Sequence, residues 1–443
     1  MLNLIEKEQK QKTFNKKLTI SEIEKFYSGS KDSLIGLEYE RLSLDVKTLK
    51  NANFENMEKI IIHFSKVLKW ELVYDGKFII GAKSPDGTSI SLEPGCQLEI
   101  SIAPKKDVLA IDLELTKIIE LLDKIANIYD VRFLGYGITP NASVDEISLI
   151  PKRRYNIMAK YLPDCQYGEL APKMMRQTAG IQINVDYINS KDAYLKLKFL
   201  NLIMPFMAGL SANSPFENNR LSDLKSIRTN VWRFTGLDRC NFFYKDIFGF
   251  LKEDHVFKNY IEAVLNVPMI FIERENKIIE INGKITFRDF IEHGFCGCSA
   301  TMDDYILHQS LCFPDVRLKK YIEIRYHDSA DYKFALALCA FYKGLMEANI
   351  KENLKKVSYL KINDIENYNK EIISNGLNYK LKNGKDGWGV ILDLFNISRQ
   401  NLNFTQRAYL EPIFSMIKTR KTNADLIQEY NISKTSDLIE LLY

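Results

Sequence analysis

The sequence has few of the residues that mark fibrous or disordered proteins. Of its 443 residues, 21 are glycine and 12 are proline, too few for a collagen-like or low-complexity chain. Lys and Arg exceed Asp and Glu by 61 − 57 = 4, so net charge gives no reason to expect a nucleic acid or a membrane surface as partner. With 46% hydrophobic residues, the chain has ample material for a folded core.

The chain also lacks a disulfide framework, a long apolar run and an apolar leader. Its seven cysteines are scattered, and the close pair Cys296 and Cys298 has no second pair or His at zinc-site spacing. The longest apolar runs, at 199–212 and 334–341, are shorter than a membrane span. The polar, Lys-rich N-terminus lacks the apolar segment of a secretory signal. We therefore expect a soluble, cytoplasmic protein with reduced thiols and no membrane partner.

No internal repeat and no Pro-, Gly- or Ser-rich linker interrupts the sequence, which favours a single domain over residues 1–443. Residues 1–32 are typical of a charged leader with a short helix, in which Ser21 and Glu24 are expected to form a capping box. Residues 330–443 are expected to be mostly helical. The spacing of apolar residues predicts three further helices, at 54–70, 108–128 and 193–210.

Between these helices, four segments alternate between apolar and polar residues. They are residues 34–41, 89–102, 180–187 and 321–327. Because successive side chains of a strand point to opposite faces, each segment is predicted to be a strand with one apolar and one polar face. Pro94-Gly95 interrupts the second segment and predicts a turn or bulge. The pattern predicts an α+β fold, in which helices cover the apolar side of a largely antiparallel sheet.

The polar faces of these strands carry many acids and amides. Their polar positions are Glu38, Glu40, Glu99, Gln182, Asn184, Glu323 and one cation, Arg325. Alternation alone is typical of a solvated strand face, but Glu and Asn are poor strand formers. If the strands share one sheet, the carboxylates repel one another unless cations hold them. Carboxylate and amide oxygens suit Mg²⁺, which usually binds together with nucleotide phosphates.

A series of motifs follows in order between residues 36 and 328. They read G-L-E-Y-E-R, I-S-L-E-P-G-C-Q-L-E-I-S, F-L-G-Y-G, P-K-R-R-Y-N-I-M, Q-I-N-V-D, A-N-S-P-F, R-T-N-V-W, N-V-P-M, T-F-R-D-F and F-P-D-V-R-L-K-K-Y-I-E-I-R. Together they resemble the plant-type glutamate–cysteine ligase family, which occurs in plants and many bacteria. Any one of these motifs is weak, but so many in order are specific. The tail beyond residue 328 matches only loosely.

The resemblance implies a ligase that uses ATP to join the γ-carboxylate of L-glutamate to the amine of L-cysteine, the first step of glutathione synthesis. It also implies the family's fold, an antiparallel sheet curved into a funnel with helices outside, as in the carboxylate–amine ligases related to glutamine synthetase. The small-molecule partners would be glutamate, cysteine and ATP, with Mg²⁺ as cofactor.

The resemblance also assigns roles to residues of this chain. The family's Mg²⁺ ligands fall on Glu38, Glu40, Glu99, Gln182 and Glu323. Its substrate-carboxylate arginines fall on Arg154 and Arg228. Arg325 would face the nucleotide phosphates, and Arg325 and Glu40 are the predicted catalytic residues.

Three departures from the family pattern qualify this transfer. Cys96 stands where the family usually has Gly; it is expected to be a small buried residue, with oxidation sensitivity as the alternative. Gln177 stands where the family has Arg, and Arg176 is displaced by one position, which would swap faces in a strand. The cysteines of the plant enzymes' redox-linked interface have no evident counterparts, so no such switch is expected.

The residues leave three functions open. The first is glutamate–cysteine ligase, and the second is a related ATP-dependent γ-glutamyl ligase with a different amine acceptor, because the acceptor site has no readable motif. The third is a non-catalytic binding protein with the same fold. A nucleic-acid patch at 152–154 is disfavoured because its three cations have little aromatic interleaving. A monomer or weak homodimer is expected.

Overall fold

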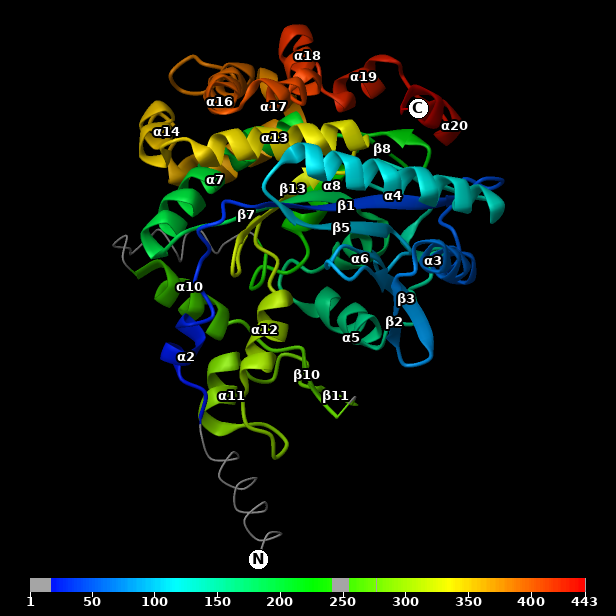
Figure 1. The fold of residues 1–443 in the computed structure, drawn as a ribbon, viewed down its shortest axis with the longest axis vertical. Coiled ribbons are helices and arrows are strands. Elements are labelled where there is room, and N and C mark those ends of the chain that lie inside the picture. Colours follow the sequence, from blue (N-terminus) through cyan, green and yellow to red (C-terminus); the bar gives the residue numbers. More distant parts are fainter. Residues whose placement is uncertain (1–16, 241–254, 276, 443) are drawn as a thin grey trace, which may run out of the picture.

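The computed structural model describes residues 17–240, 255–275 and 277–442, and an antiparallel sheet lies at its centre (Figure 1). Among these residues the sheet has nine strands in the order β12-β13-β7-β1-β5-β4-β3-β2, with β6 paired to β1 off this path. Along that order the strands are β12 (Val316–Leu318), β13 (Ile322–Asp328), β7 (Gly180–Val185), β1 (Ile35–Asp45), β5 (Leu98–Lys105), β4 (Ser89–Leu92), β3 (Phe78–Lys83), β2 (Glu71–Asp75) and β6 (Val131–Leu134). Every pairing in it is antiparallel. The predicted α+β fold with a large antiparallel sheet is confirmed.

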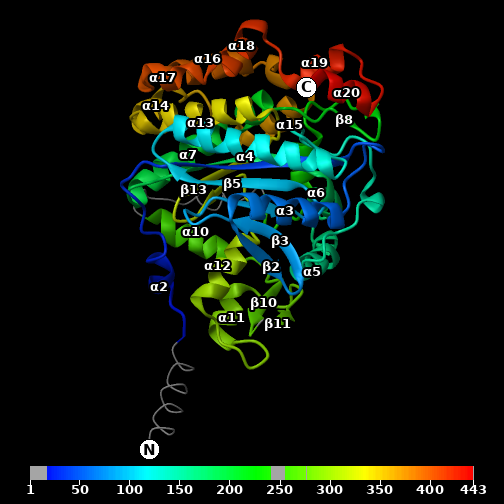
Figure 2. The same cartoon turned by 45° about the vertical axis from the view of Figure 1, so that its right-hand side comes forward.

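Helices cover the apolar face of the sheet in two layers, seen in the upper half of Figures 1 and 2. The inner layer contains α13 (Tyr332–Glu347) on β1 and β7, α7 (Ser190–Leu210) on β13, and α4 (Val108–Ile128) on β5 and β6. The outer part contains α14 (Ile350–Lys356), α15 (Ile365–Asn375), α16 (Gly387–Asn401), α17 (Phe404–Ala408), α18 (Glu411–Thr419), α19 (Asn423–Glu429) and α20 (Thr435–Leu442). The helical character predicted after residue 330 is therefore present.

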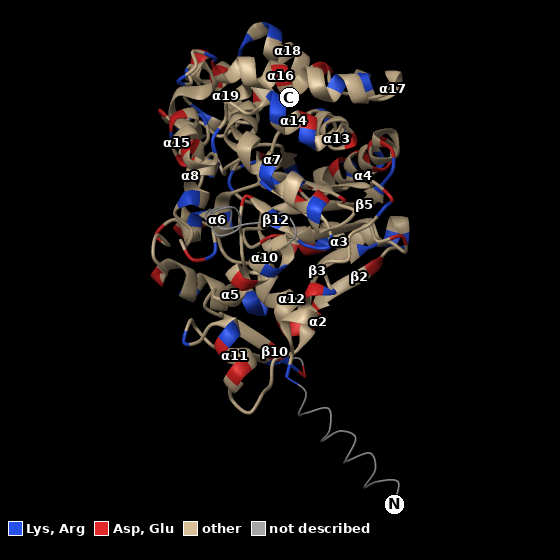
Figure 3. Ribbon diagram, turned by 90° about the vertical axis from the view of Figure 1, so that its left-hand side faces the viewer, with Lys and Arg blue, Asp and Glu red and all other residues tan. Residues whose placement is uncertain are grey.

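The opposite side of the sheet faces a second group of short helices, in the lower half of Figure 1. They are α2 (Ile20–Glu24), α5 (Arg153–Tyr161), α6 (Ala171–Gln177), α10 (Val256–Leu265), α11 (Phe287–His293) and α12 (Met302–Ser310), with the hairpin β10 (Phe271–Arg274) and β11 (Lys277–Glu280). The helix α3 (Phe54–Leu68) packs on β3. In the view of Figure 3, acidic and basic segments are interspersed over these elements.

Alternation along the strands fixes which face of the sheet is buried under the helices. On β1 the side chains of Ile35, Leu37 and Tyr39 are buried in the core, as predicted. The second predicted strand divides into β4 and β5 at the predicted turn, where Cys96 adopts a positive φ of 69°. The three predicted helices are present as α3, α4 and α7.

The predicted N-terminal capping box is displaced along the chain. Thr19, not Ser21, caps α2: its hydroxyl accepts from the Glu22 amide at 3.3 Å, and the Glu22 carboxylate accepts from the Thr19 amide at 3.0 Å. This register places Ile23 wholly inside the core. The rest of the predicted leader, residues 1–16, lies outside the described residues.

Helix α7 is the one described helix that is long and apolar enough to cross a membrane. Its apolar window is 89% buried within the protein, however, so its composition is that of a core helix. Helices α15 and α14 pack against α7, and α13 covers the same face of the sheet.

A buried histidine on α12 gives the fold a testable dependence on pH. The His308 Nε2 donates to the Val264 carbonyl at 3.0 Å, and its ring stacks on Phe287. Burial lowers the pKa of His308 to about 3. In the unfolded chain the pKa of a histidine is about 6.5, so between these values unfolding takes up a proton and acid favours the unfolded state.

We therefore expect His308→Gln, which keeps a donor for the Val264 carbonyl, to weaken the loss of stability in acid. Below about pH 6 its free energy of unfolding should fall less steeply than that of the unaltered protein, by about 1.4 kcal/mol per pH unit. Urea unfolding between about pH 5 and 7 measures both slopes. Equal slopes would show that His308 takes up no proton on unfolding in this range, which would contradict the lowered pKa.

Candidate active site

A cavity of about 230 Å³ lies against the polar face of the sheet. Its wall contains four carboxylates, three guanidinium groups and two amides: Glu38, Glu40, Glu93, Glu99, Arg154, Arg317, Arg325, Gln97 and Gln182. Four of the five predicted Mg²⁺ ligands therefore lie around one space. They come from segments up to 144 positions apart, 182 − 38 = 144, which the sheet brings together.

The register of the central strands explains this convergence. Glu40 on β1 stands opposite Glu99 on β5, and Glu38 stands opposite Gln182 on β7. Residues directly opposite in an antiparallel pair have Cβ atoms about 5 Å apart on the same face. The Glu-x-Glu spacing of β1 thus aims both carboxylates at the cavity, with the partners of each on a neighbouring strand.

Amides and hydroxyls hold these carboxylates in place. The Asn184 side chain donates to Glu38 Oε1 at 2.9 Å. Glu40 accepts from the Gln182 amide at 3.0 Å and from the Gly180 backbone N–H at 2.5 Å. Glu99 accepts from the hydroxyl of Ser101 at 3.0 Å. Such neutral donors orient a carboxylate without neutralising its charge. The negative charge of the three carboxylates is therefore not compensated by these hydrogen bonds.

The unbalanced charge appears in the pKa values. Burial raises the pKa of Glu40 to about 7, and the charge of Glu93 adds to this effect. Burial and then Glu93 raise the pKa of Glu99 well above its ordinary value. Burial and then Glu323 raise the pKa of Glu38. Perturbed carboxylates of this kind in a cavity mark a functional site, because a bound cation would relieve the repulsion.

Glu323 differs from the other predicted ligands. Its Oε2 accepts from Arg317 Nε at 2.6 Å and from Arg325 Nη1 at 3.0 Å, and its Oε1 accepts from Lys319 Nζ at 2.8 Å. Burial alone would raise the pKa of Glu323, but these three cations together bring it well below its ordinary value. The side chain is fully buried behind the cavity and forms no part of its wall.

The donor set fits a divalent cation in its chemistry. Glu38, Glu40 and Glu99 offer hard carboxylate oxygens, and the Asn184 Oδ1 beside them is buried with no hydrogen-bond partner. Within the described ranges, however, no three Asp, Glu, His or Cys side chains are gathered as a ready metal-binding group. The predicted ligands share a cavity, therefore, but the Mg²⁺ assignment stays a prediction.

The two predicted substrate arginines lie in different surroundings. Arg154, in the first turn of α5, faces the cavity, and its Nε is buried without a hydrogen-bond partner. Arg228, on α8 (Ile227–Arg233), does not face that cavity: it is 3% exposed and lines a narrow crevice beyond it. Trp232, Phe313 and Arg325 line both spaces and separate them.

Arg325 faces the cavity as predicted, and its position is fixed by polar partners. Its Nη1 donates to Gln182 Oε1 at 2.7 Å as well as to Glu323. Its guanidinium also lies 5.7 Å from the centre of the Trp232 ring. A rigid cation therefore stands beside the acid-lined floor of the cavity.

Sequence reasoning missed three residues of the cavity wall, and each had a signal. Glu93 has the same strand parity as Glu99, and Trp232 is one helical turn from Arg228. Arg317 lies in the segment that also contains Arg325. The wall also contains the apolar residues Met158, Met174, Met175, Leu311 and Phe313, none of which was a predicted site residue.

The swap of faces considered for Arg176 and Gln177 does not apply, because these residues are not in a strand. These residues end the helix α6, which carries Met174 and Met175 into the cavity wall. The Arg176 Nη1 donates to the Val144 carbonyl at 3.2 Å, outside the cavity. Because consecutive residues of a helix point in different directions, the one-residue displacement leaves the Arg176 side chain facing away from the cavity. Cys96 is buried, and burial raises its pKa to about 12, as expected of a packing residue.

Comparison with known proteins identifies the family of the chain. The model of glutamate–cysteine ligase family 2 matches residues 34–374. The chloroplastic glutamate–cysteine ligase of Medicago truncatula is 29% identical over 425 residues, covering 92% of this chain and 81% of the relative. That of Arabidopsis thaliana is 30% identical over 409 residues, covering 90% and 76%.

A solved structure shows the same fold. It is the crystal structure of glutamate–cysteine ligase from Francisella tularensis in complex with AMP, with a TM-score of 0.55, 14% identity, and coverage of 90% of this chain and 84% of that one. The chain therefore belongs to glutamate–cysteine ligase family 2, a family of ATP-dependent carboxylate–amine ligases.

Proposed function

We propose that the protein is a glutamate–cysteine ligase, which forms γ-glutamylcysteine, ADP and phosphate from L-glutamate, L-cysteine and ATP. The observation that carries this proposal is the cavity in which four carboxylates face three arginines. The carboxylates suit the binding of Mg²⁺, which accompanies the ATP phosphates. The arginines suit the binding of substrate carboxylates and of the phosphoryl group during its transfer.

The reaction needs both kinds of group because a carboxylate does not react with an amine directly. An oxygen of the glutamate γ-carboxylate attacks the γ-phosphorus of ATP, ADP leaves, and an acyl phosphate forms. The amine nitrogen then attacks the acyl carbon, the phosphate leaves with that oxygen, and the amine loses a proton. Mg²⁺, when bound at Glu38, Glu40, Glu99 and Gln182, would neutralise charge on the phosphates. Glu323, the fifth predicted ligand, lies outside the cavity wall and is held by three cations.

The chain's own cations support the transfer step. Arg325 is held rigidly by Gln182 and Glu323, so it can meet developing negative charge without reorganising. Arg154 faces the cavity with an unpartnered buried Nε, which suits a clamp on a substrate carboxylate. Arg228 is the second predicted clamp, and it would act from the crevice behind Trp232.

The apolar part of the cavity wall supports a small, uncharged acceptor side chain. Met158, Met174 and Met175 line the cavity, as does Trp232. The thioether surfaces are polarisable, pack well against sulfur and offer no opposite charge to a charged side chain. Cysteine fits this surface better than lysine, aspartate or glutamate.

The test is magnesium-dependent ADP formation, measured with L-glutamate and a panel of amines. We expect no turnover without glutamate and the highest kcat/KM with L-cysteine, followed by small neutral amino acids. Equal kcat/KM for cysteine and other amines would favour a γ-glutamyl ligase with a different acceptor. A folded sample without any glutamate-dependent ADP formation would favour a binding protein.

A further inference from the structure

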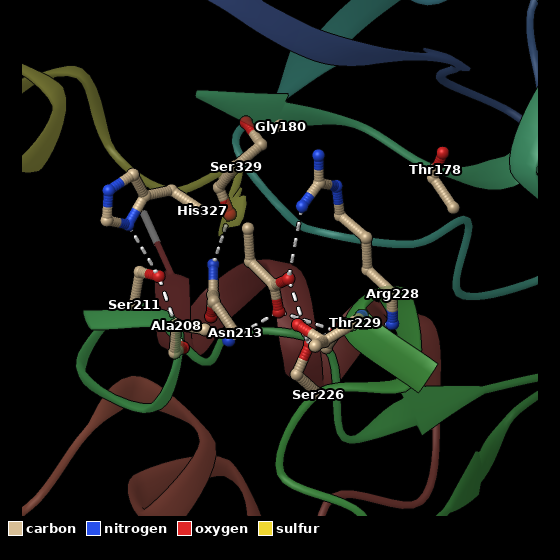
Figure 4. Close-up of polar contacts among 12 residues, drawn as sticks. Thr178, Gly180, Ala208, Ser211, Asn213, Ser226, Arg228, Thr229, His327 and Ser329 are labelled. Atoms are coloured by element: carbon tan, nitrogen blue, oxygen red, sulfur yellow. Dashed lines mark hydrogen bonds and ion pairs between the residues drawn. The ribbon is translucent and has the colours of Figure 1, made fainter. Parts of the chain in front are cut away.

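The side chain of Arg228 lies in a slot made by segments that are far apart in the sequence (Figure 4). Its Nη2 donates to the Arg325 carbonyl at 3.1 Å, and its guanidinium lies 5.9 Å from the centre of the Trp232 ring. A Cβ on Gly180 would come within 2.3 Å of Nη2, so the absence of a side chain at 180 opens the slot. The same Gly180 donates its N–H to Glu40.

One buried acid lies at the inner end of this slot. Asp328 ends β13, is 1% exposed, and its Oδ1 stands 3.9 Å from Arg228 Nη1. Both of its oxygens are held: Oδ2 accepts from the Ser214 hydroxyl at 2.6 Å and Oδ1 from the Ser226 hydroxyl at 2.9 Å. The Asn213 backbone N–H adds a third donor at 2.9 Å.

These contacts fix the acid more firmly than the cation. Three neutral donors orient the carboxylate of Asp328, and close packing adds to this, since a Cβ on Gly137 would come within 2.8 Å of its Cγ. Arg228 by contrast has a buried Nε with no hydrogen-bond partner. A buried arginine with few hydrogen bonds needs a fixed opposite charge to stay in one rotamer.

Ser226 connects the acid to the helix that carries the cation. Its hydroxyl caps α8 by accepting from the Thr229 N–H at 2.9 Å, and it donates to Asp328. The beginning of α8, and hence the base of the Arg228 side chain, is thereby tied to the end of β13. Arg228 then touches Trp232 and the backbone of Arg325, two parts of the cavity wall.

We infer that Asp328 is a positioning residue, which acts through Arg228 to hold the Trp232–Arg325 side of the cavity in its binding arrangement. Asp328 forms no part of the wall of the cavity or of the crevice. The contacts described above support the positioning of Arg228 by Asp328. The expected effect on kinetics rests on the proposed ligase function.

The test is the variant Asp328→Asn, which removes the charge of the side chain and keeps its size. We expect Asp328→Asn to raise KM for L-glutamate about tenfold or more, while KM for ATP changes less than about twofold. A crystal structure of the same variant should show Arg228 out of the slot, away from the Arg325 carbonyl. This structural readout does not depend on which reaction the protein catalyses.

Asp304→Asn is the matched control. Asp304 is also a buried acid paired with an arginine, with Arg274 Nη1 at 2.6 Å, but it lies on α12 away from the cavity. It should lower thermal stability to a similar degree and leave KM for L-glutamate unchanged. Parallel losses of stability and of kcat/KM in both variants would mean that Asp328 is merely structural.

A double variant separates positioning from independent effects. Because Asp328 acts through Arg228, Asp328→Asn added to Arg228→Lys should cost little beyond Arg228→Lys alone. Additive losses, or Arg228 remaining in its slot in the crystal structure of Asp328→Asn, would overturn the inference. If Arg228 leaves the slot and glutamate kinetics do not change, the proposed role of Arg228 fails while the positioning of Arg228 by Asp328 stands.

Discussion

Glu323→Gln is expected to abolish turnover and to lower the free energy of unfolding by about 3–5 kcal/mol. The loss of stability follows from the three cations around this carboxylate, Arg317, Lys319 and Arg325, whose contacts lie between 2.6 and 3.0 Å. Removing one partner from a buried ion cluster leaves the others uncompensated. The loss of turnover follows because Arg325 would no longer be aimed at the cavity.

Urea unfolding and ADP formation together measure these two effects. A second substitution, Lys319→Met in the Glu323→Gln background, removes one uncompensated charge and should restore part of the stability without restoring turnover. Near-normal activity of Glu323→Gln would contradict both the predicted metal role and the role of the cluster in fixing Arg325.

Glu99→Gln is expected to have the opposite effect on stability and an equally severe effect on activity. Because burial and neighbouring carboxylates raise the pKa of Glu99, folding at neutral pH must either protonate its carboxyl group or bury its charge, and both oppose folding. A neutral amide avoids this cost, so the substitution should raise the free energy of unfolding by about 1–3 kcal/mol. Turnover should fall at least about 100-fold, because Glu99 is one of the acids predicted to hold Mg²⁺.

The gain in stability should depend on pH in a defined direction. Unfolded Glu99 loses its proton above about pH 4.3, whereas the folded protein retains it to higher pH, so unfolding releases a proton in that window. The advantage of Glu99→Gln should therefore be absent near pH 4 and grow as pH rises. Unfolding curves at several pH values measure it, and a variant less stable than the unaltered protein at pH 7 would show that Glu99 is stabilised by a partner.

Strand alternation predicted which side chains face the cavity, but not how strands are paired. The parity of Glu38, Glu40, Glu99 and Gln182 in the sequence is the parity seen in the sheet. Parity follows from local backbone geometry and so can be predicted from a single segment. The pairing of β1 with both β5 and β7 depends on contacts between segments distant in the sequence. This pairing brings the four residues together, and it could not be predicted from any single segment.

The surroundings of the charged groups were least predictable. No motif indicated that Glu323 is enclosed by three cations, although Arg317, Lys319 and Arg325 all lie within six residues of it and β12 pairs with β13. The contact of Arg228 with the Arg325 carbonyl joins segments 97 positions apart, so it could not be predicted locally. Arg176 was considered as if it lay in a strand, but it lies in the last turn of α6, which ends three residues before β7 begins at Gly180. In such segments tertiary packing decides the structure.

The most direct test of the account follows one oxygen atom. L-glutamate labelled with ¹⁸O in its γ-carboxylate is incubated with ATP, Mg²⁺, L-cysteine and the protein, and the inorganic phosphate is analysed by mass spectrometry. The account predicts one ¹⁸O atom in each phosphate released with ADP, since the carboxylate oxygen leaves with phosphorus. Phosphate without label, formed alongside γ-glutamylcysteine or formed without any amide product, would contradict it.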